Sequence, residues 1–230
     1  MRALAKLTLG LRVTGVRQDG YHELDAEMVT VDLADELTFG EGDGLEVSGP
    51  AAAGVPVEHN LVSRALDAVG RRAQVHLHKV IPAGAGLGGG SADAAAVLRW
   101  AGVDDLAVAA SLGADVPFCL VGGRARVRGV GEVVEPLGDE ARSFTLLTPP
   151  LHVSTPAVYA AWDRLGGPTA EGPNDLEPAA LAVEPRLAAA RDELGERTGG
   201  VPVLAGSGST WFVEGVFEGP GLVVVRTAVP

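Results

Sequence analysis

The feature that most constrains this chain is a glycine-rich segment, residues 82–96, with the sequence PAGAGLGGGSADAAA. Because glycine has no Cβ atom, such a segment can adopt positive φ angles and approach a ligand closely. The alanines that follow favour a helix over residues 92–100, with Ser91 as its N-cap and Asp93 in its first turn. The free N–H groups at the start of that helix favour an anion, and a nucleotide phosphate is the natural candidate.

Other glycine-rich patterns fit this segment less well. A Walker phosphate loop needs Gly-Lys-Ser/Thr after the glycines, and residues 82–96 contain no lysine. A dinucleotide-binding fingerprint can be forced onto residues 84–89 only as G-x-G-x-G-G, which is a poor match. A flexible linker is the remaining alternative, but linkers are rich in polar residues and do not join a strand to a helix. A phosphate loop of another type is therefore the preferred interpretation.

Length and charge limit the class of protein. With 230 residues, of which 47% are hydrophobic, the chain can bury a sizeable core as one large or two small domains. Its net charge of −12 disfavours binding to nucleic acid or to a membrane surface, because both need basic patches. An anionic ligand must therefore be held by backbone N–H groups, a few cations and a metal ion.

Three further features favour a cytoplasmic protein. No run of about 18 apolar residues is present, so no membrane span is expected. Residues 1–6 precede no long apolar region of the kind found in a signal peptide. Cys119 is the single cysteine, which excludes an internal disulfide bond and is typical of a buried, inert thiol.

Arginine greatly outnumbers lysine among the basic residues. Of the 18 Lys and Arg residues, only Lys6 and Lys79 are lysines. Coding bias replaces lysine by arginine wherever either will serve, so a lysine that remains is a candidate for a site that needs a compact ammonium group. Both lysines are therefore candidate functional residues.

Hydrophobic periodicity predicts a mixture of strands and helices. Residues 3–16 alternate apolar and polar, which indicates a half-buried strand with Lys6 and Thr8 on one face. The other predicted strands cover residues 26–33, 35–39, 44–48, 74–81, 124–128, 130–135, 144–148, 201–205, 210–213 and 222–229. The other predicted helices cover residues 60–69, 104–112, 155–165 and 176–194, the last broken near Pro185. Because strands and helices do not alternate regularly, the α+β class is favoured over a doubly wound sheet.

Short motifs extend along nearly the whole chain in a fixed order. They are Ala5-Lys6-Leu7, DGYHEL at 19–24, Asn60-Leu61, KVIP at 79–82, the glycine segment, LGADVP at 112–117, STPAVY at 154–159, NDLE at 174–177 and GSGST at 206–210. Together they resemble the GHMP kinase superfamily of galactokinases, homoserine kinases, mevalonate kinases and phosphomevalonate kinases. The DGYH and NDLE segments are similar to those of the branch that acts on a cytidylyl methylerythritol. Thr8 departs from the pattern, because Asn is usual two residues after the lysine.

The resemblance implies a two-domain α+β fold with the site in the cleft between the domains. Residues 1–141 would form an ATP-binding domain like the second domain of ribosomal protein S5, and residues 142–230 a ferredoxin-like domain. That second domain is expected to be shortened, because only eight residues, Glu214 to Gly221, separate its last two strands. This connection is too short for a crossover helix of about a dozen residues.

The resemblance also implies an activity and its small-molecule partners. The enzyme would use ATP and Mg²⁺ to phosphorylate the 2-hydroxyl of the cytidylyl methylerythritol in non-mevalonate isoprenoid biosynthesis. Two alternatives stay open: a GHMP kinase for homoserine, mevalonate or a sugar, and a ligand sensor on the same fold without catalysis. The oligomeric state is not predicted.

The motifs assign a catalytic role to two residues by resemblance. Asp115 would be the general base that accepts the proton of the substrate hydroxyl, and Lys6 would lie beside it and keep it ionised. Without the resemblance, Asp115 would be interpreted as a turn residue just past a helix end and Lys6 as a solvent-facing charge.

The remaining site residues are also assigned by resemblance. The nucleotide would be bound by Asn60, Lys79, Pro82, Gly84, Gly86, Leu87, Gly88, Gly89, Gly90 and Ser91. The substrate would be bound by Thr8, Tyr21, His22, Thr155, Pro156, Tyr159, Gly206 and Ser207. Tyr21 and Tyr159 would sandwich the cytosine ring while His22 bonds to its edge. No metal site within the protein is expected, because His76 and His78 share a strand face without a third ligand nearby.

Overall fold

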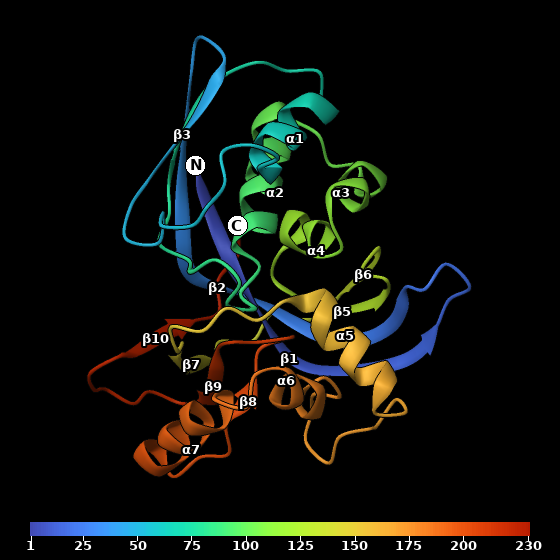
Figure 1. Ribbon diagram of the computed structural model, residues 1–230. Coiled ribbons are helices and arrows are strands. Elements are labelled where there is room, and N and C mark those ends of the chain that lie inside the picture. The colour runs from blue at the N-terminus through green and yellow to red at the C-terminus, as the bar shows by residue number, and fades with distance from the viewer.

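The computed structural model describes all 230 residues and contains two sheets with helices packed on them (Figure 1). The first sheet has the order β3-β4-β2-β5-β6, and β1 pairs with β2 in addition. Its strands are β1 (Arg2–Val16), β2 (His22–Gly40), β3 (Gly44–Ser48), β4 (Gln74–His78), β5 (Arg124–Gly129) and β6 (Val133–Pro136). The long antiparallel hairpin of β1 and β2 forms the centre of this part of the molecule.

Four helices gather next to this hairpin: α1 (Leu61–Ala68), α2 (Gly89–Ala101), α3 (Leu106–Leu112) and α4 (Val116–Val121). Helix α2 packs against β1, α1 and α4, and its alanines Ala94, Ala95 and Ala96 are fully buried. Small side chains let the neighbouring backbones approach α2 closely. The alanine-rich sequence after the glycine loop thus lets β1, α1 and α4 all pack closely against α2.

The second sheet has the order β10-β7-β9-β8. Its strands are β7 (Ser143–Leu147), β8 (Val203–Leu204), β9 (Trp211–Glu214) and β10 (Leu222–Arg226), and α5 (Thr155–Arg164), α6 (Glu177–Val183) and α7 (Leu187–Thr198) lie between β7 and β8 in the chain. Counted within this unit, the spatial order of the strands is fourth, first, third, second, as in a ferredoxin-like unit. Residues 215–221 join β9 to β10 without a helix, so the prediction of a shortened unit is confirmed.

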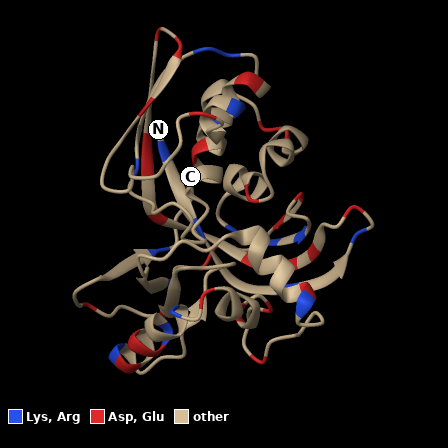
Figure 2. Ribbon diagram, in the orientation of Figure 1, with Lys and Arg blue, Asp and Glu red and all other residues tan.

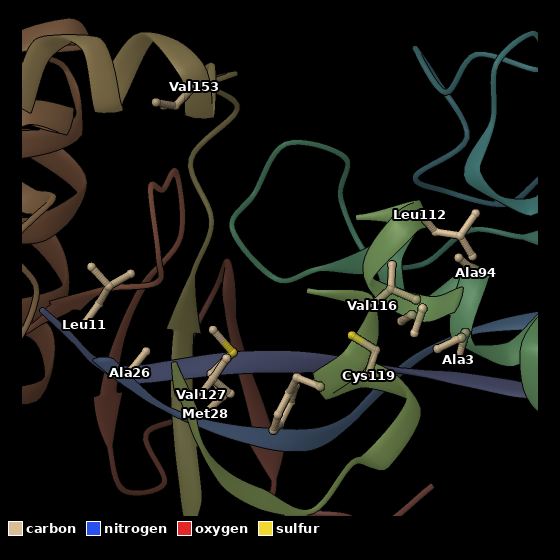
Figure 3. Packing of buried hydrophobic residues seen from close by; sticks show 14 of the residues in the cluster. Ala3, Leu11, Ala26, Met28, Ala94, Leu112, Val116, Cys119, Val127 and Val153 are labelled. Atoms are coloured by element: carbon tan, nitrogen blue, oxygen red, sulfur yellow. The ribbon is translucent and has the colours of Figure 1, made fainter. Parts of the chain in front are cut away.

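The two parts share their hydrophobic core. A cluster of 12 buried residues joins Leu7 and Val29 of the first sheet to Phe144 and Val225 of the second. A larger cluster of 38 buried residues runs through the helices, and Figure 3 shows Val116 and Cys119 of α4 in this cluster with Ala94 of α2. The chain passes from one sheet to the other through residues 137–142.

Most predicted elements are present, with four corrections. The strands predicted at 26–33 and 35–39 are one strand, β2, and the strand predicted to reach residue 81 ends at His78. Beyond Lys79, the backbone N–H groups of Val80 and Ile81 donate to the Asp35 side chain instead of to a neighbouring strand, so the strand does not continue. Helix α4 was not predicted, because a Gly-Ala-Asp-Val-Pro segment is typical of a turn. Helix α2 begins earlier than predicted.

Basic and acidic residues are interspersed over most elements of the chain (Figure 2). Along β5, Arg124 pairs with Glu27 at 2.7 Å, and Arg126 pairs with Asp25. Exposed pairs of this kind contribute little to stability. No helix of the protein has the length and apolar character needed to cross a membrane.

Candidate active site

A pocket of about 860 Å³ lies between the two parts of the chain. Its walls come from β1, the start of β2, the glycine loop, α5 and the second glycine loop at residues 206–210. All the predicted site residues line this pocket except Leu87. The Leu87 side chain is instead buried in the core between the sheets, and its backbone carbonyl accepts a hydrogen bond of 3.0 Å from the Lys6 N–H.

The glycine loop enters α2 differently from the prediction. Helix α2 begins at Gly89, with Gly88 as its N-cap at a φ of 68°. The predicted cap, Ser91, is therefore wrong, because Gly89 and Gly90 already adopt helical conformation and place Ser91 inside the first turn. Ser91 is half-buried and lines the pocket, whereas Asp93 lies deeper in the helix and is 2% exposed.

The two lysines of the chain lie directly behind two consecutive loop glycines. A Cβ at Gly88 would lie 2.7 Å from Cγ of Lys6. A Cβ at Gly89 would lie 3.2 Å from Nζ of Lys79 and 3.0 Å from Cγ2 of Ile81. These glycines thus leave space for lysine side chains behind the loop, in addition to any ligand in front of it. The scarcity of lysine in the sequence is the signal that pointed to this region.

Lys6 meets Asp115 at the floor of the pocket. Nζ of Lys6 lies 3.3 Å from Oδ2 of Asp115, and it donates a hydrogen bond of 3.1 Å to Oγ1 of Thr8. Lys6 is buried, whereas the Asp115 side chain is 33% exposed. The two-residue period of β1 puts Lys6 and Thr8 on one face. Asp115 is the N-cap residue of α4, but its side chain makes no capping hydrogen bond. Its carboxylate is therefore free to face the pocket.

Lys79 belongs to a buried cluster with two aspartates. Its Nζ donates to Asp35 and, at 2.7 Å, to Oδ2 of Asp93. Oδ1 of Asp35 also accepts from the backbone N–H groups of Val80 and Ile81 at 2.6 and 2.9 Å, so Asp35 is fully bonded. All three charged residues are at most 3% exposed. Sequence reasoning missed Asp35, since a single aspartate in an apolar strand carries no signal of its distant partner.

Asp93 is the less satisfied carboxyl group of this cluster. Its Oδ1 is buried and has no hydrogen-bond partner. The pKa of Asp93 is raised to about 7, chiefly by burial and also by the negative charge of Asp35, while Lys79 acts in the opposite direction. Asp93 is therefore the group that holds a proton when two buried carboxyl groups share one ammonium.

The predicted substrate side of the pocket contains an aromatic group. The centroid of the His22 ring lies 4.7 Å from that of Tyr159 with a tilt of 33°, and 5.5 Å from that of Trp162 in a nearly perpendicular arrangement. Nε2 of His22 lies 2.8 Å from Oδ1 of Asp163. Tyr21 is 61% exposed, and burial raises the pKa of Tyr159. One face of Tyr159 is thus taken by His22, which the predicted sandwich by Tyr21 and Tyr159 did not include.

Two asparagines shape the pocket through the backbone. Asn60 caps α1 by accepting a hydrogen bond of 2.9 Å from the Val62 N–H. Asn174 donates to the carbonyl groups of Leu204 and Gly206 at 2.9 and 2.7 Å, which holds the second glycine loop. Within that loop, Oγ of Ser207 lies 2.8 Å from Oγ1 of Thr155, the first residue of α5.

Fold and site together define a GHMP kinase. The family model described as GHMP kinases N terminal domain matches residues 60–123. Solved structures at low identity share the fold, such as an L. major mevalonate kinase with a TM-score of 0.63 at 13% identity.

Comparisons at higher identity are more specific. A 4-diphosphocytidyl-2-C-methyl-D-erythritol kinase from Paracoccus denitrificans is 40% identical, over 91% of this chain and 84% of that protein. One from Mesorhizobium japonicum is 39% identical, over 98% and 88%. A solved 4-(cytidine 5'-diphospho)-2C-methyl-D-erythritol kinase superposes with a TM-score of 0.78 at 36% identity, covering 99% of both chains. This chain belongs to the 4-diphosphocytidyl-2-C-methyl-D-erythritol kinase family.

Proposed function

We propose that this chain transfers the γ-phosphoryl group of ATP to the 2-hydroxyl of 4-diphosphocytidyl-2-C-methyl-D-erythritol, a step of non-mevalonate isoprenoid biosynthesis. The observation that carries the proposal is the contact of Lys6 with Asp115 on the floor of a pocket that joins the glycine loop to the His22 group. Membership of the family supports the choice of substrate over homoserine, mevalonate or a sugar. The intact acid–lysine pair disfavours a sensor without catalysis.

Asp115 is the proposed general base. Its carboxylate accepts the proton of the 2-hydroxyl while the oxygen bonds to the γ-phosphorus and the bond to the ADP oxygen breaks. Lys6 lies 3.3 Å from Asp115, so its ammonium group holds the carboxylate in place beside the entering hydroxyl. The same ammonium stabilises negative charge on the entering oxygen. Thr8, proposed above as a substrate contact, holds Lys6 through its hydroxyl.

ATP brings more negative charge than the pocket can balance by itself. Both lysines that line the pocket are already paired with aspartates, so neither ammonium is free for the phosphates. Backbone N–H groups at the start of α2 supply part of the compensation. No group of three or more His, Cys, Asp or Glu side chains could hold a metal alone.

These residues fit a Mg²⁺ ion that arrives on the ATP phosphates. Such an ion typically keeps several waters and uses one or two carboxylates besides the phosphates, and it supplies positive charge to the transferring group. Asp115, one third exposed in the pocket and next to Lys6, could bond to a metal-bound water.

A coupled ADP-release assay tests the proposal with the cytidylyl, homoserine and mevalonate substrates in parallel. We expect turnover with the cytidylyl substrate alone. Asp115→Asn should bind ATP and substrate normally but lower kcat by roughly 10²–10⁴, the usual contribution of a general base. Tight binding of a substrate without any phosphorylation by the wild type would favour the sensor instead.

A further inference from the structure

The His22 ring is fixed on three sides by one helix. Tyr159 packs against the ring at a tilt of 33°, Trp162 lies nearly perpendicular to it, and Asp163 lies 2.8 Å from its Nε2, all from α5. In Figure 1, α5 lies beside the hairpin of β1 and β2, where β2 begins with His22. The His22 side chain is 9% exposed, although it lines the pocket. A ring held this tightly presents its remaining nitrogen in one direction.

The contact with Asp163 determines what that nitrogen can do. A carboxylate only accepts hydrogen bonds, so Nε2 of His22 must carry the hydrogen. In a neutral imidazole the other nitrogen is then an acceptor, because the bond made by one nitrogen sets the state of the other. No protein group bonds to Nδ1 of His22 in the structure. His22 lines the pocket, and its Nδ1 is therefore an acceptor without a protein partner on a ring that packs against Tyr159.

We propose that Asp163 is a specificity-determining residue that acts through His22: it fixes Nδ1 of His22 as the acceptor for the exocyclic amino group of the substrate base. This inference rests on the proposed function, which supplies a cytidylyl substrate. Cytosine carries an N4 amino donor at the position where uracil carries a carbonyl oxygen. Two acceptors would face each other in a uridylyl complex, so the arrangement selects cytosine.

Asp163 itself lies outside the predicted site residues. Its side chain is 49% exposed, and its position in an unremarkable Ala-Trp-Asp-Arg segment carries no motif. Asp163 is 141 residues from His22 in the chain, so only the folded structure shows that they are partners.

The kinetic test compares two substrates, the cytidylyl compound and its uridylyl counterpart, over three variants. Asp163→Ala should raise KM for the cytidylyl substrate roughly tenfold, with kcat and the KM for ATP unchanged, because one oriented hydrogen bond weakens. It should also reduce the preference for cytidylyl over uridylyl substrate. Asp163→Asn keeps an oxygen that accepts a hydrogen bond from Nε2 of His22. It should therefore restore most of the affinity for the cytidylyl substrate and most of the preference for it over the uridylyl substrate. Arg164→Ala, an exposed neighbour on the same helix, is the matched control.

Two kinetic outcomes would overturn the inference. One is an Asp163→Ala enzyme whose KM values and base preference equal those of the wild type. The other is a wild type that prefers the uridylyl substrate, since Nδ1 would then be a donor.

A second measurement does not depend on the proposed function. ¹⁵N NMR of the imidazole, assigned with His22→Gln, should show a neutral ring protonated at Nε2 in the wild type and an averaged signal in Asp163→Ala. A wild-type ring protonated at Nδ1 near neutral pH would overturn the inference. An enzyme with the expected NMR signal but no activity on any cytidylyl substrate would refute the proposed function alone, and leave the fixing of the ring by Asp163 supported.

Discussion

At the scale of single residues, the choice of lysine at position 6 has a geometric reason. The Lys6 stem passes behind Gly88, and its ammonium reaches Asp115 and Thr8 within 3.3 Å. In the second glycine loop, a Cβ at Gly206 would lie 3.4 Å from Nζ of Lys6. The space between the two glycine loops therefore fits a compact ammonium.

Lys6→Arg should fail although it keeps the charge. A planar guanidinium is wider than an ammonium and would press on the backbone of Gly206 or move Asp115. We expect kcat to fall by roughly 10²-fold, the usual cost of losing one charge-stabilising group, with ATP affinity nearly unchanged. Single-turnover phosphorylation measures this. Arg64→Lys, the reverse exchange at an exposed position on α1, is the control, and full activity of Lys6→Arg would contradict the geometric argument.

At the scale of elements, the glycine loop and α2 are supported from behind by side chains of other elements. Gly88 has a φ of +68° and packs on Lys6, whereas Gly102, at the other end of α2, has a φ of +73° and no atom near its missing Cβ. The two glycines share a backbone conformation and differ in their surroundings. This difference separates backbone strain from loss of space.

Gly88→Ala and Gly102→Ala should therefore behave differently. Both place a side chain in a left-handed conformation and should lower the free energy of unfolding by about 1–2 kcal/mol. Only Gly88→Ala collides with the Lys6 stem, so only this variant should lose turnover. Urea unfolding and kcat for both variants test the claim, which is wrong if Gly88→Ala keeps wild-type kcat.

The buried cluster of Asp35, Lys79 and Asp93 joins β2, the segment after β4, and α2. Because the pKa of Asp93 is raised to about 7, the folded protein holds a proton that the unfolded chain releases above about pH 4. The unfolded state then binds fewer protons, so the free energy of unfolding falls as pH rises from about 4 to 7 and levels off above.

Asp93→Asn removes this titration while keeping the shape. The stability of the variant relative to the wild type should therefore increase as pH rises from 5 to about 7, with little change above about pH 8. Urea unfolding of both proteins at a series of pH values measures the difference. A difference that is independent of pH would show that Asp93 is ionised throughout this range.

At the scale of the whole molecule, the two sheets are not independent units. The cluster of 12 buried residues lies between them, and Asp175 pairs with Arg12 of β1 at 2.6 Å across the two parts. Separating the parts would expose this shared apolar surface to water. The pocket between them is therefore held by the same contacts that hold the fold together.

We expect the chain to unfold in a single transition. Trp100 reports on the first part and Trp211 on the second, so two variants that each keep one of these and lack both other tryptophans, Trp162 included, should give coincident urea unfolding curves. Far-ultraviolet circular dichroism should follow the same curve. Two separated midpoints would show that the parts unfold independently.

Local sequence patterns were sufficient to predict many elements of this protein. The alternation over residues 3–16 identified β1, and the glycines and alanines identified the loop and the existence of α2. The short connection after Glu214 predicted that no helix lies between the last two strands. These features depend on periodicity and backbone freedom within a few residues, which a single sequence contains. The residues named from the motif resemblance all line the pocket except Leu87, and their roles in binding and catalysis stay predictions.

Only the tertiary structure decided what these residues touch. The sequence does not state that Lys6 and Lys79 lie behind Gly88 and Gly89, that Asp35 binds Lys79 from 44 residues away, or that Asp163 fixes His22. Such pairs form because strand pairing and helix packing bring distant segments together, and a polar side chain that becomes buried must then find a partner. The sequence by itself determined the local elements and the kind of loop, while the folded structure determined which charges meet in the pocket.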